Sequence, residues 1–136
     1  HAQVFRFKRT DENQKAALAA RVCTYLYEPN AAILNAGAFN AVACKYSLQK
    51  LDLNSHLYTS DVELNTFPGH VYRVVEVAHP YKLRKVYQGM SITSRNFPDA
   101  AEHIKKRLKS TEGNNFRLFA TTVAGKRLFI VAELIY

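Results

Sequence analysis

The pattern of hydrophobic and polar positions in the first half of the chain favours helices. Apolar residues recur every three to four positions over residues 12–27, which predicts an amphipathic helix. A second helix is predicted over residues 31–50, because Asn30 is a good N-cap and the apolar residues after it keep a helical period. Pro29 separates the two. We therefore expect a helical part over about residues 10–50.

The second half of the chain favours strands. Residues 70–77 alternate at a period of two, and residues 116–123 and 127–136 form a predicted hairpin around a turn that contains glycine. Pro98 suits the first turn of a helix, which is predicted over residues 99–108. The helix would interrupt an otherwise continuous series of strands.

Four shorter segments complete the pattern. Residues 4–8 alternate apolar and basic side chains and predict an edge strand or an arm, and residues 56–59 predict a short strand. Residues 83–88 predict another strand, whereas the hydroxyl-rich residues 91–96 predict a polar loop.

Together these elements predict an α+β fold with N-terminal helices followed by a mainly antiparallel sheet with one inserted helix. We expect a single domain over residues 1–136, with the sheet part at about residues 69–136. A content of 48% hydrophobic and 22% charged residues excludes a wholly disordered chain. No apolar run approaches the roughly 20 residues that span a bilayer, so we expect a soluble protein. Cys23 and Cys44 lack the spacing of a zinc site, and no metal is expected.

The net charge of +8 is distributed unevenly. Residues 69–136 hold twelve of the nineteen Lys and Arg residues but only five of the eleven Asp and Glu residues. Such an excess of positive charge favours an anionic macromolecule as partner, either a nucleic acid or an acidic protein surface.

One arginine interrupts an apolar strand pattern. Strict alternation places Val71, Arg73, Val75 and Val77 on one face of the strand over residues 70–77. Arginine is almost never fully buried without a partner. Arg73 must therefore extend to solvent, pair with a carboxylate, or bind an anion in a cleft.

Three segments resemble, in order, the site of the ADP-ribosyltransferase family, which has an Arg strand, a Ser-Thr-Ser strand and a late Glu. Val71-Tyr72-Arg73-Val74 resembles the Arg strand, Ser91-Ile92-Thr93-Ser94 followed by Phe97 is similar to the hydroxyl segment, and Glu133-Leu134-Ile135-Tyr136 resembles the ending that carries the catalytic Glu.

The resemblance implies an enzyme that uses NAD as co-substrate to modify a macromolecular target, without a metal. It implies that Arg73 binds a phosphate of NAD, with Tyr72, Ser94 and Phe97 completing the cofactor site. Ser91 and Thr93 would order the ribose and hold Glu133, which would stabilise the oxocarbenium-like transition state. A toxin of this kind is a secreted or delivered effector, and an acidic inhibitor would be its cognate partner.

The residues leave a second hypothesis open, a metal-independent ribonuclease of the bacterial toxin-domain type. In such an enzyme a base takes the 2′-hydroxyl proton, an acid protonates the leaving group and cations stabilise the phosphorane. The candidate groups in the basic half are His70, His79 and His103, with the cations Arg73, Lys82, Arg84 and Lys85.

A third hypothesis is a basic nucleic-acid-binding or assembly module without catalysis. Aromatic and basic side chains that share an exposed sheet face would stack bases and hold phosphates. The predicted hairpin carries residues of both kinds, namely Phe116, Phe119, Phe129, Tyr136, Arg117, Lys126 and Arg127.

Overall fold

A computed structural model describes residues 5–6 and 8–136 and shows one curled sheet of seven strands with three α-helices. The strands are β1 (Tyr25–Pro29), β2 (Gln49–Lys50), β3 (Tyr58–Ser60), β4 (Gly69–Ala78), β5 (Met90–Ser94), β6 (Phe116–Val123) and β7 (Lys126–Leu134). The helices are α1 (Ala31–Ala36), α2 (Phe39–Tyr46) and α3 (Ala101–Leu108), preceded by the 3-10 helix η1 (Arg9–Asn13).

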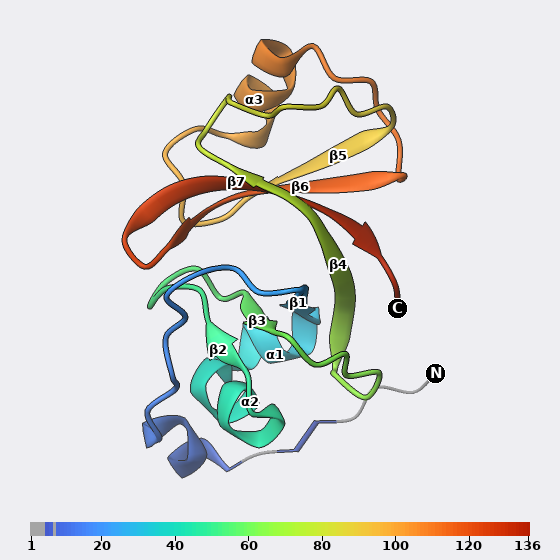
Figure 1. Cartoon of the computed structure of the whole chain (residues 1–136). Coiled ribbons are helices and arrows are strands. Elements are labelled where there is room, and N and C mark those ends of the chain that lie inside the picture. Colours follow the sequence, from blue (N-terminus) through green and yellow to red (C-terminus); the bar gives the residue numbers. More distant parts are fainter. Residues whose placement is uncertain (1–4, 7) are drawn as a thin grey trace.

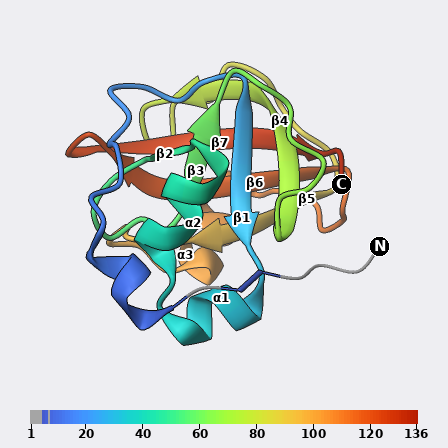
Figure 2. The same ribbon diagram turned by 90° about the horizontal axis from the view of Figure 1, so that it is seen from below.

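The strand order in the sheet is β2-β3-β1-β4-β7-β6-β5. All neighbours are antiparallel except β5 and β6, which are parallel and are connected through α3. The long strand β4 curves from the part of the sheet under α3 down to the part that holds α1 and α2 (Figure 1). Seen from below, α1 and α2 lie next to the part of the sheet that contains β1, β2 and β3 (Figure 2).

Three apolar clusters hold these layers together. The first lies between α2 and strands β1 and β3, and the third lies between α3 and strands β5 to β7. The second joins the two halves of the chain across the curled sheet, and it contains Leu26, Leu51, Phe119 and Ile130, all with no exposed surface.

The predicted order of elements is wrong, because the chain does not begin with two long helices. The helix predicted over residues 12–27 is replaced by η1, an irregular segment and β1. Leu26 and Tyr27 are both fully buried, in different clusters on opposite faces of β1. A strand buried on both faces reads as a continuous apolar run, which periodicity does not separate from a buried helix.

In place of the single helix predicted over residues 31–50, the structure has two short helices, α1 and α2. Gly37 adopts a left-handed conformation with φ of 67° and ends α1, and Ser47 ends α2 in the same way. Asn30 caps α1 as expected, its side chain accepting from the Ile33 N–H at 3.0 Å.

Other predictions fail in the second half as well. The polar loop expected at residues 91–96 is largely strand β5, and because β5 is parallel to β6 the sheet is mixed. No strand forms at residues 83–88. The predicted segment at residues 4–8 lies partly outside the described residues. The strand over residues 70–77, the hairpin and the helix that ends at Leu108 agree with the structure within a few residues.

Candidate nucleic-acid interface

The residues that resembled an NAD site divide between the two faces of the sheet. Arg73 and Glu133 are opposite each other on β4 and β7 and form an ion pair of 2.7 Å, with side chains 58% and 40% exposed. Tyr72, the preceding residue on β4, points to the other face, where it packs on Phe119. Thr93 lies beside Phe119 on that second face, so the hydroxyl strand and Glu133 do not converge.

The remaining members of that set have structural partners. The Tyr72 hydroxyl donates to Glu28 at 3.0 Å, Thr93 accepts from Arg117 at 2.8 Å, and Ser94 donates to the Asp99 carbonyl at 2.6 Å. Ser91 lines a small pocket with His70, and Phe97 packs against Phe129.

Of the three histidines of the ribonuclease hypothesis, His103 lies on α3, and His70 and His79 are apart on β4 and just beyond its end. His70 lies in the second position of β4 and His79 directly follows its end. Strands rise by about 3.3 Å per residue, so these rings are held at opposite ends of a strand and do not act as one acid–base pair. The hairpin does not present Phe119 and Phe129 to a ligand either, because neither side chain has any exposed surface.

Positive charge instead gathers around the end of α3 and the β4–β5 connection. We call this the basic surface, and define it by six exposed side chains: Lys82, Arg84, Lys85, Lys106, Arg107 and Lys109. None of the six is in any of the four ion pairs formed within residues 5–6 and 8–136. Unpaired cations on one surface raise the local concentration of an anionic partner.

Tyr81 holds the connection against α3. The guanidinium of Arg107 lies over the Tyr81 ring, with 3.7 Å between the Arg107 Cζ atom and the ring centroid. The Tyr81 hydroxyl donates to the Asp99 carboxylate at 2.6 Å. The Tyr81 ring also contacts Phe129 of the third apolar cluster, with 4.9 Å between the two ring centroids. Tyr81 has a left-handed backbone with φ of 64°, a conformation that the surrounding packing must hold in place.

Glu76 fixes the other end of the connection. It accepts from the Arg84 backbone N–H at 2.7 Å and from the Tyr87 hydroxyl at 2.6 Å. Partial burial opposes ionisation, but these hydrogen bonds together hold the pKa of Glu76 below its ordinary value. Because Glu76 binds the backbone of the connection, the side chains of Lys82, Arg84 and Lys85 are left exposed to solvent.

A pocket of about 210 Å³ opens within the basic surface. Its lining combines Lys85 and Lys109 with the apolar or aromatic side chains of Tyr81, Leu83 and Val86. Val86 is 90% exposed. Cations beside aromatic and apolar side chains suit a ligand that carries both phosphates and flat bases.

The sequence pointed to some residues of the basic surface, but it did not show that all six lie together in the fold. Lys82, Arg84 and Lys85 were candidates for catalysis, whereas Lys106, Arg107 and Lys109 come from another element. The signal that pointed to all six was the positive charge of residues 69–136. Only the packing of Tyr81 on α3 shows that they share one surface.

No helix within the described residues is both long and apolar enough to cross a membrane. No group of three His, Cys, Asp or Glu side chains in the described ranges is placed to hold a metal ion. Cys23 and Cys44 are free thiols.

Comparisons with known proteins divide the chain at the start of β4. Residues 25–68 match the model of a ferredoxin-like domain, and residues 69–134 match that of a THUMP-like domain. No curated protein gives a significant match. The structure is similar to the crystal structure of a "putative methyltransferase" from Porphyromonas gingivalis W83, with a TM-score of 0.91 and 34% sequence identity.

These similarities overturn the expected ADP-ribosyltransferase activity, the NAD co-substrate and the toxin class. The alignment covers 97% of this chain but 35% of the Porphyromonas gingivalis protein, so the chain spans about a third of that protein's length. In this chain, the segments that match the ferredoxin-like and THUMP-like models are joined by one continuous sheet.

Proposed function

We propose that this chain is the RNA-binding part of a methyltransferase that acts on RNA, and that the basic surface contacts the RNA phosphates. The observation that carries the proposal is the set of six exposed cations around the end of α3, which form no ion pair within the described residues and all lie within the THUMP-like segment. Phosphate contacts by Lys and Arg supply most of the sequence-independent affinity for nucleic acids. The similarity to the Porphyromonas gingivalis protein supports the link to methyl transfer.

The cofactor of such an enzyme is S-adenosylmethionine, and the described residues do not fit it. Nucleotide-like cofactors are commonly bound where a glycine-rich loop follows a strand in a parallel sheet. Among the seven strands of the described residues, only β5 and β6 are parallel, and the β5–α3 connection, residues 95–100, contains no glycine. We therefore assign methyl transfer to the part of the relative that this chain does not cover, and RNA recognition to this chain.

In this role the basic surface would fix the position of the RNA backbone. Phosphate contacts set the register of a bound nucleic acid but carry no sequence information. The side chains of Tyr81, Leu83 and Val86, which line the pocket, would contact a base or sugar exposed beside those phosphates.

Fluorescence anisotropy with a labelled RNA hairpin tests the proposal. The triple variant Lys82→Gln, Lys85→Gln, Lys109→Gln removes three cations from the basic surface. We expect the salt dependence of log K to become shallower by about 2 to 3, since each lost phosphate contact removes nearly one unit from the slope.

The matched control removes the same charge elsewhere, with Lys8→Gln, Lys15→Gln, Lys126→Gln, all exposed residues outside the basic surface. This control should keep most of the salt slope of the unmodified protein. Equal losses in the two variants would show that net charge alone drives binding, and the basic surface would then not be the interface.

A further inference from the structure

Strand β5 is an edge of the sheet, and its free side is open. It has β6 as its only neighbour in the strand order. The N–H groups of Phe116 and Asn115 bind the Gly89 carbonyl, and the Arg95 N–H binds the Ala120 carbonyl. Odd-numbered residues of this segment therefore face β6, and the backbone groups of Met90, Ile92 and Ser94 face outward.

Most of these outward groups are available. The Met90 N–H already donates to the Thr111 carbonyl at 2.9 Å, which covers the beginning of the strand. Among the residues that the structure describes, no strand pairs with the Met90 carbonyl, both backbone groups of Ile92 and the Ser94 N–H on this side. An edge with free donors and acceptors at two-residue spacing is a template for another strand.

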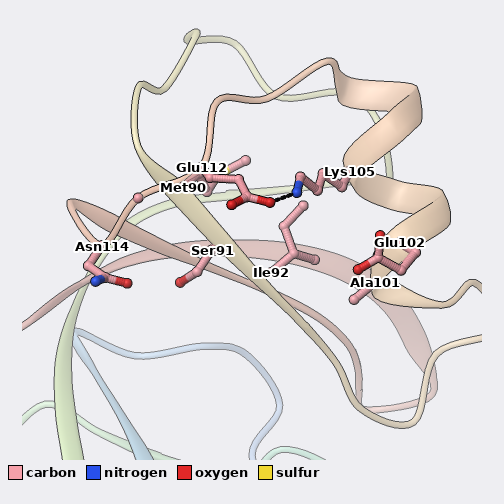
Figure 3. Close-up of a pocket in the computed structure, with 9 residues that line it drawn as sticks. Met90, Ser91, Ile92, Ala101, Glu102, Lys105, Glu112 and Asn114 are labelled. Atoms are coloured by element: carbon pink, nitrogen blue, oxygen red, sulfur yellow. Dashed lines mark ion pairs between the residues drawn. The ribbon is translucent and has the colours of Figure 1, made fainter.

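A groove of about 500 Å³ runs along this free edge. Met90, Ser91 and Ile92 form its floor, and Figure 3 shows α3 on one side and residues 112–114 on the other. The α3 wall presents Ala101, Glu102 and Lys105. An edge strand beside a helix, with a slot between them, is the geometry in which extended peptides add to a sheet.

The charge of the groove differs from that of the rest of the protein. Its charged lining residues are Glu102, Lys105 and Glu112, which sum to a negative charge on a chain of net charge +8. Lys105 forms an ion pair with Glu112 across the groove (Figure 3). Glu102 forms no ion pair within the described residues. Carboxylates repel phosphates, so this lining disfavours RNA and favours a cationic occupant.

We propose that the groove between β5 and α3 binds an extended, basic peptide segment of a partner protein, which adds as an eighth strand beside β5. Its main chain would pair with the Met90 carbonyl, Ile92 and the Ser94 N–H. Its cationic side chains would face Glu102 and Glu112, displacing Lys105 from the existing pair, and an apolar side chain would pack on Ile92 and Ala101. The site is separate from the basic surface and does not depend on RNA binding.

The test uses a fluorescein-labelled hexapeptide of alternating lysine and valine as the probe. We expect saturable binding in fluorescence anisotropy, with protection of the Ile92 and Ser94 amides from hydrogen exchange measured by NMR. A peptide of the same sequence with alternate backbone nitrogens methylated keeps the charge but loses strand pairing. It should bind at least tenfold more weakly.

Protein variants identify the groove as the site. Glu102→Gln, Glu112→Gln should weaken binding of the lysine–valine peptide about tenfold, whereas the matched control Glu63→Gln, Glu133→Gln removes two acids elsewhere and should leave it unchanged. The proposal is overturned by equal binding of the methylated peptide, by equal losses in the two variants, or by no binding at millimolar peptide. It is also overturned if an RNA hairpin displaces the peptide and protects the same two amides.

Discussion

At the scale of single residues, Arg73 shows what a strand pattern can and cannot tell. Of the three expected alternatives, which were solvent, a carboxylate or an anion in a cleft, the structure shows the first two, because the Arg73 side chain is 58% exposed and paired with Glu133. The register of β4 shifts between Val74 and Glu76 at a bulge, so strict alternation does not hold along the strand. Val77 lies opposite Ile130 of the second cluster, whereas alternation had grouped it with Arg73. An inserted residue of this kind leaves no periodic signal.

The exposed Arg73–Glu133 pair is expected to contribute little to stability. Glu133→Gln removes the charge but keeps the size of the side chain, and exposed ion pairs typically contribute about 0.2 to 1 kcal/mol. We expect the free energy of unfolding in urea to fall by less than about 1 kcal/mol, and by still less in 0.5 M salt. A loss of several kcal/mol, unchanged by salt, would mean that Glu133 has a structural role beyond this pair.

Tyr58 is expected to make the protein sensitive to alkali. It is fully buried, its hydroxyl donates to the Phe39 carbonyl at 2.8 Å, and burial together with the charge of Glu12 raises the pKa of Tyr58 well above its ordinary value. A raised pKa in the folded state means that the folded protein keeps the proton more tightly. The associated stability is complete below the unfolded pKa of about 10 and is lost as the pH rises above it.

The variant Tyr58→Phe tests whether the raised pKa of Tyr58 makes the folded protein less stable as the pH rises above about 10. The variant loses one hydrogen bond, about 1 kcal/mol at neutral pH, but it no longer loses stability through ionisation of residue 58. Urea unfolding at pH 8, 10 and 11 should therefore show a shallower decline for the variant, by up to about 1.4 kcal/mol per pH unit above pH 10. Parallel declines in the two proteins would contradict the assignment.

At the scale of elements, Gly69 is the tightest point between β1 and β4. A Cβ atom there would overlap the Glu28 carbonyl oxygen and lie 2.9 Å from the Pro29 Cα, and these are backbone atoms that do not rotate away. Gly125, in the turn between β6 and β7, has a left-handed φ of 80° but nothing within 4 Å of an added Cβ.

The two glycines allow a matched comparison. We expect Gly125→Ala to cost about 1 kcal/mol, through its left-handed backbone alone. Gly69→Ala should cost clearly more, about 3 kcal/mol, since overpacking against backbone forces β1 and β4 apart. Denaturant midpoints of the two variants measure the difference, and equal costs would show that the β1–β4 contact adjusts easily.

The elements also divide into those that local sequence specifies and those that it does not. The β6–β7 hairpin and α3 were predictable because turn, proline and periodic signals coincide in residues near one another. Strand β5 was missed, since Ser91, Thr93 and Ser94 are typical of loops and become a strand only by pairing with β6. The basic surface was missed for the same reason, because its residues meet through tertiary packing.

At the scale of the whole molecule, the two matched segments share one sheet and one core. Strand β4 begins the THUMP-like segment, yet it pairs along its first five residues with β1 of the ferredoxin-like segment. The second cluster places Leu26, Leu51 and Leu57 of one segment against Phe119 and Ile130 of the other. Removing either segment would expose large apolar side chains of the other to water, and removing the ferredoxin-like segment would also expose the edge of β4 that pairs with β1.

We therefore expect residues 1–136 to unfold as one cooperative unit. Calorimetry should give a single transition in which the van't Hoff and calorimetric enthalpies agree. Gly69→Ala, at the boundary of the two segments, should lower that transition without splitting it, because β1 and β4 belong to the same sheet. A fragment of residues 69–136 should lack stable structure by circular dichroism and amide exchange. If the fragment folds, or if two transitions separate in the variant, the segments are independent domains, and their shared sheet would be a docking contact between them.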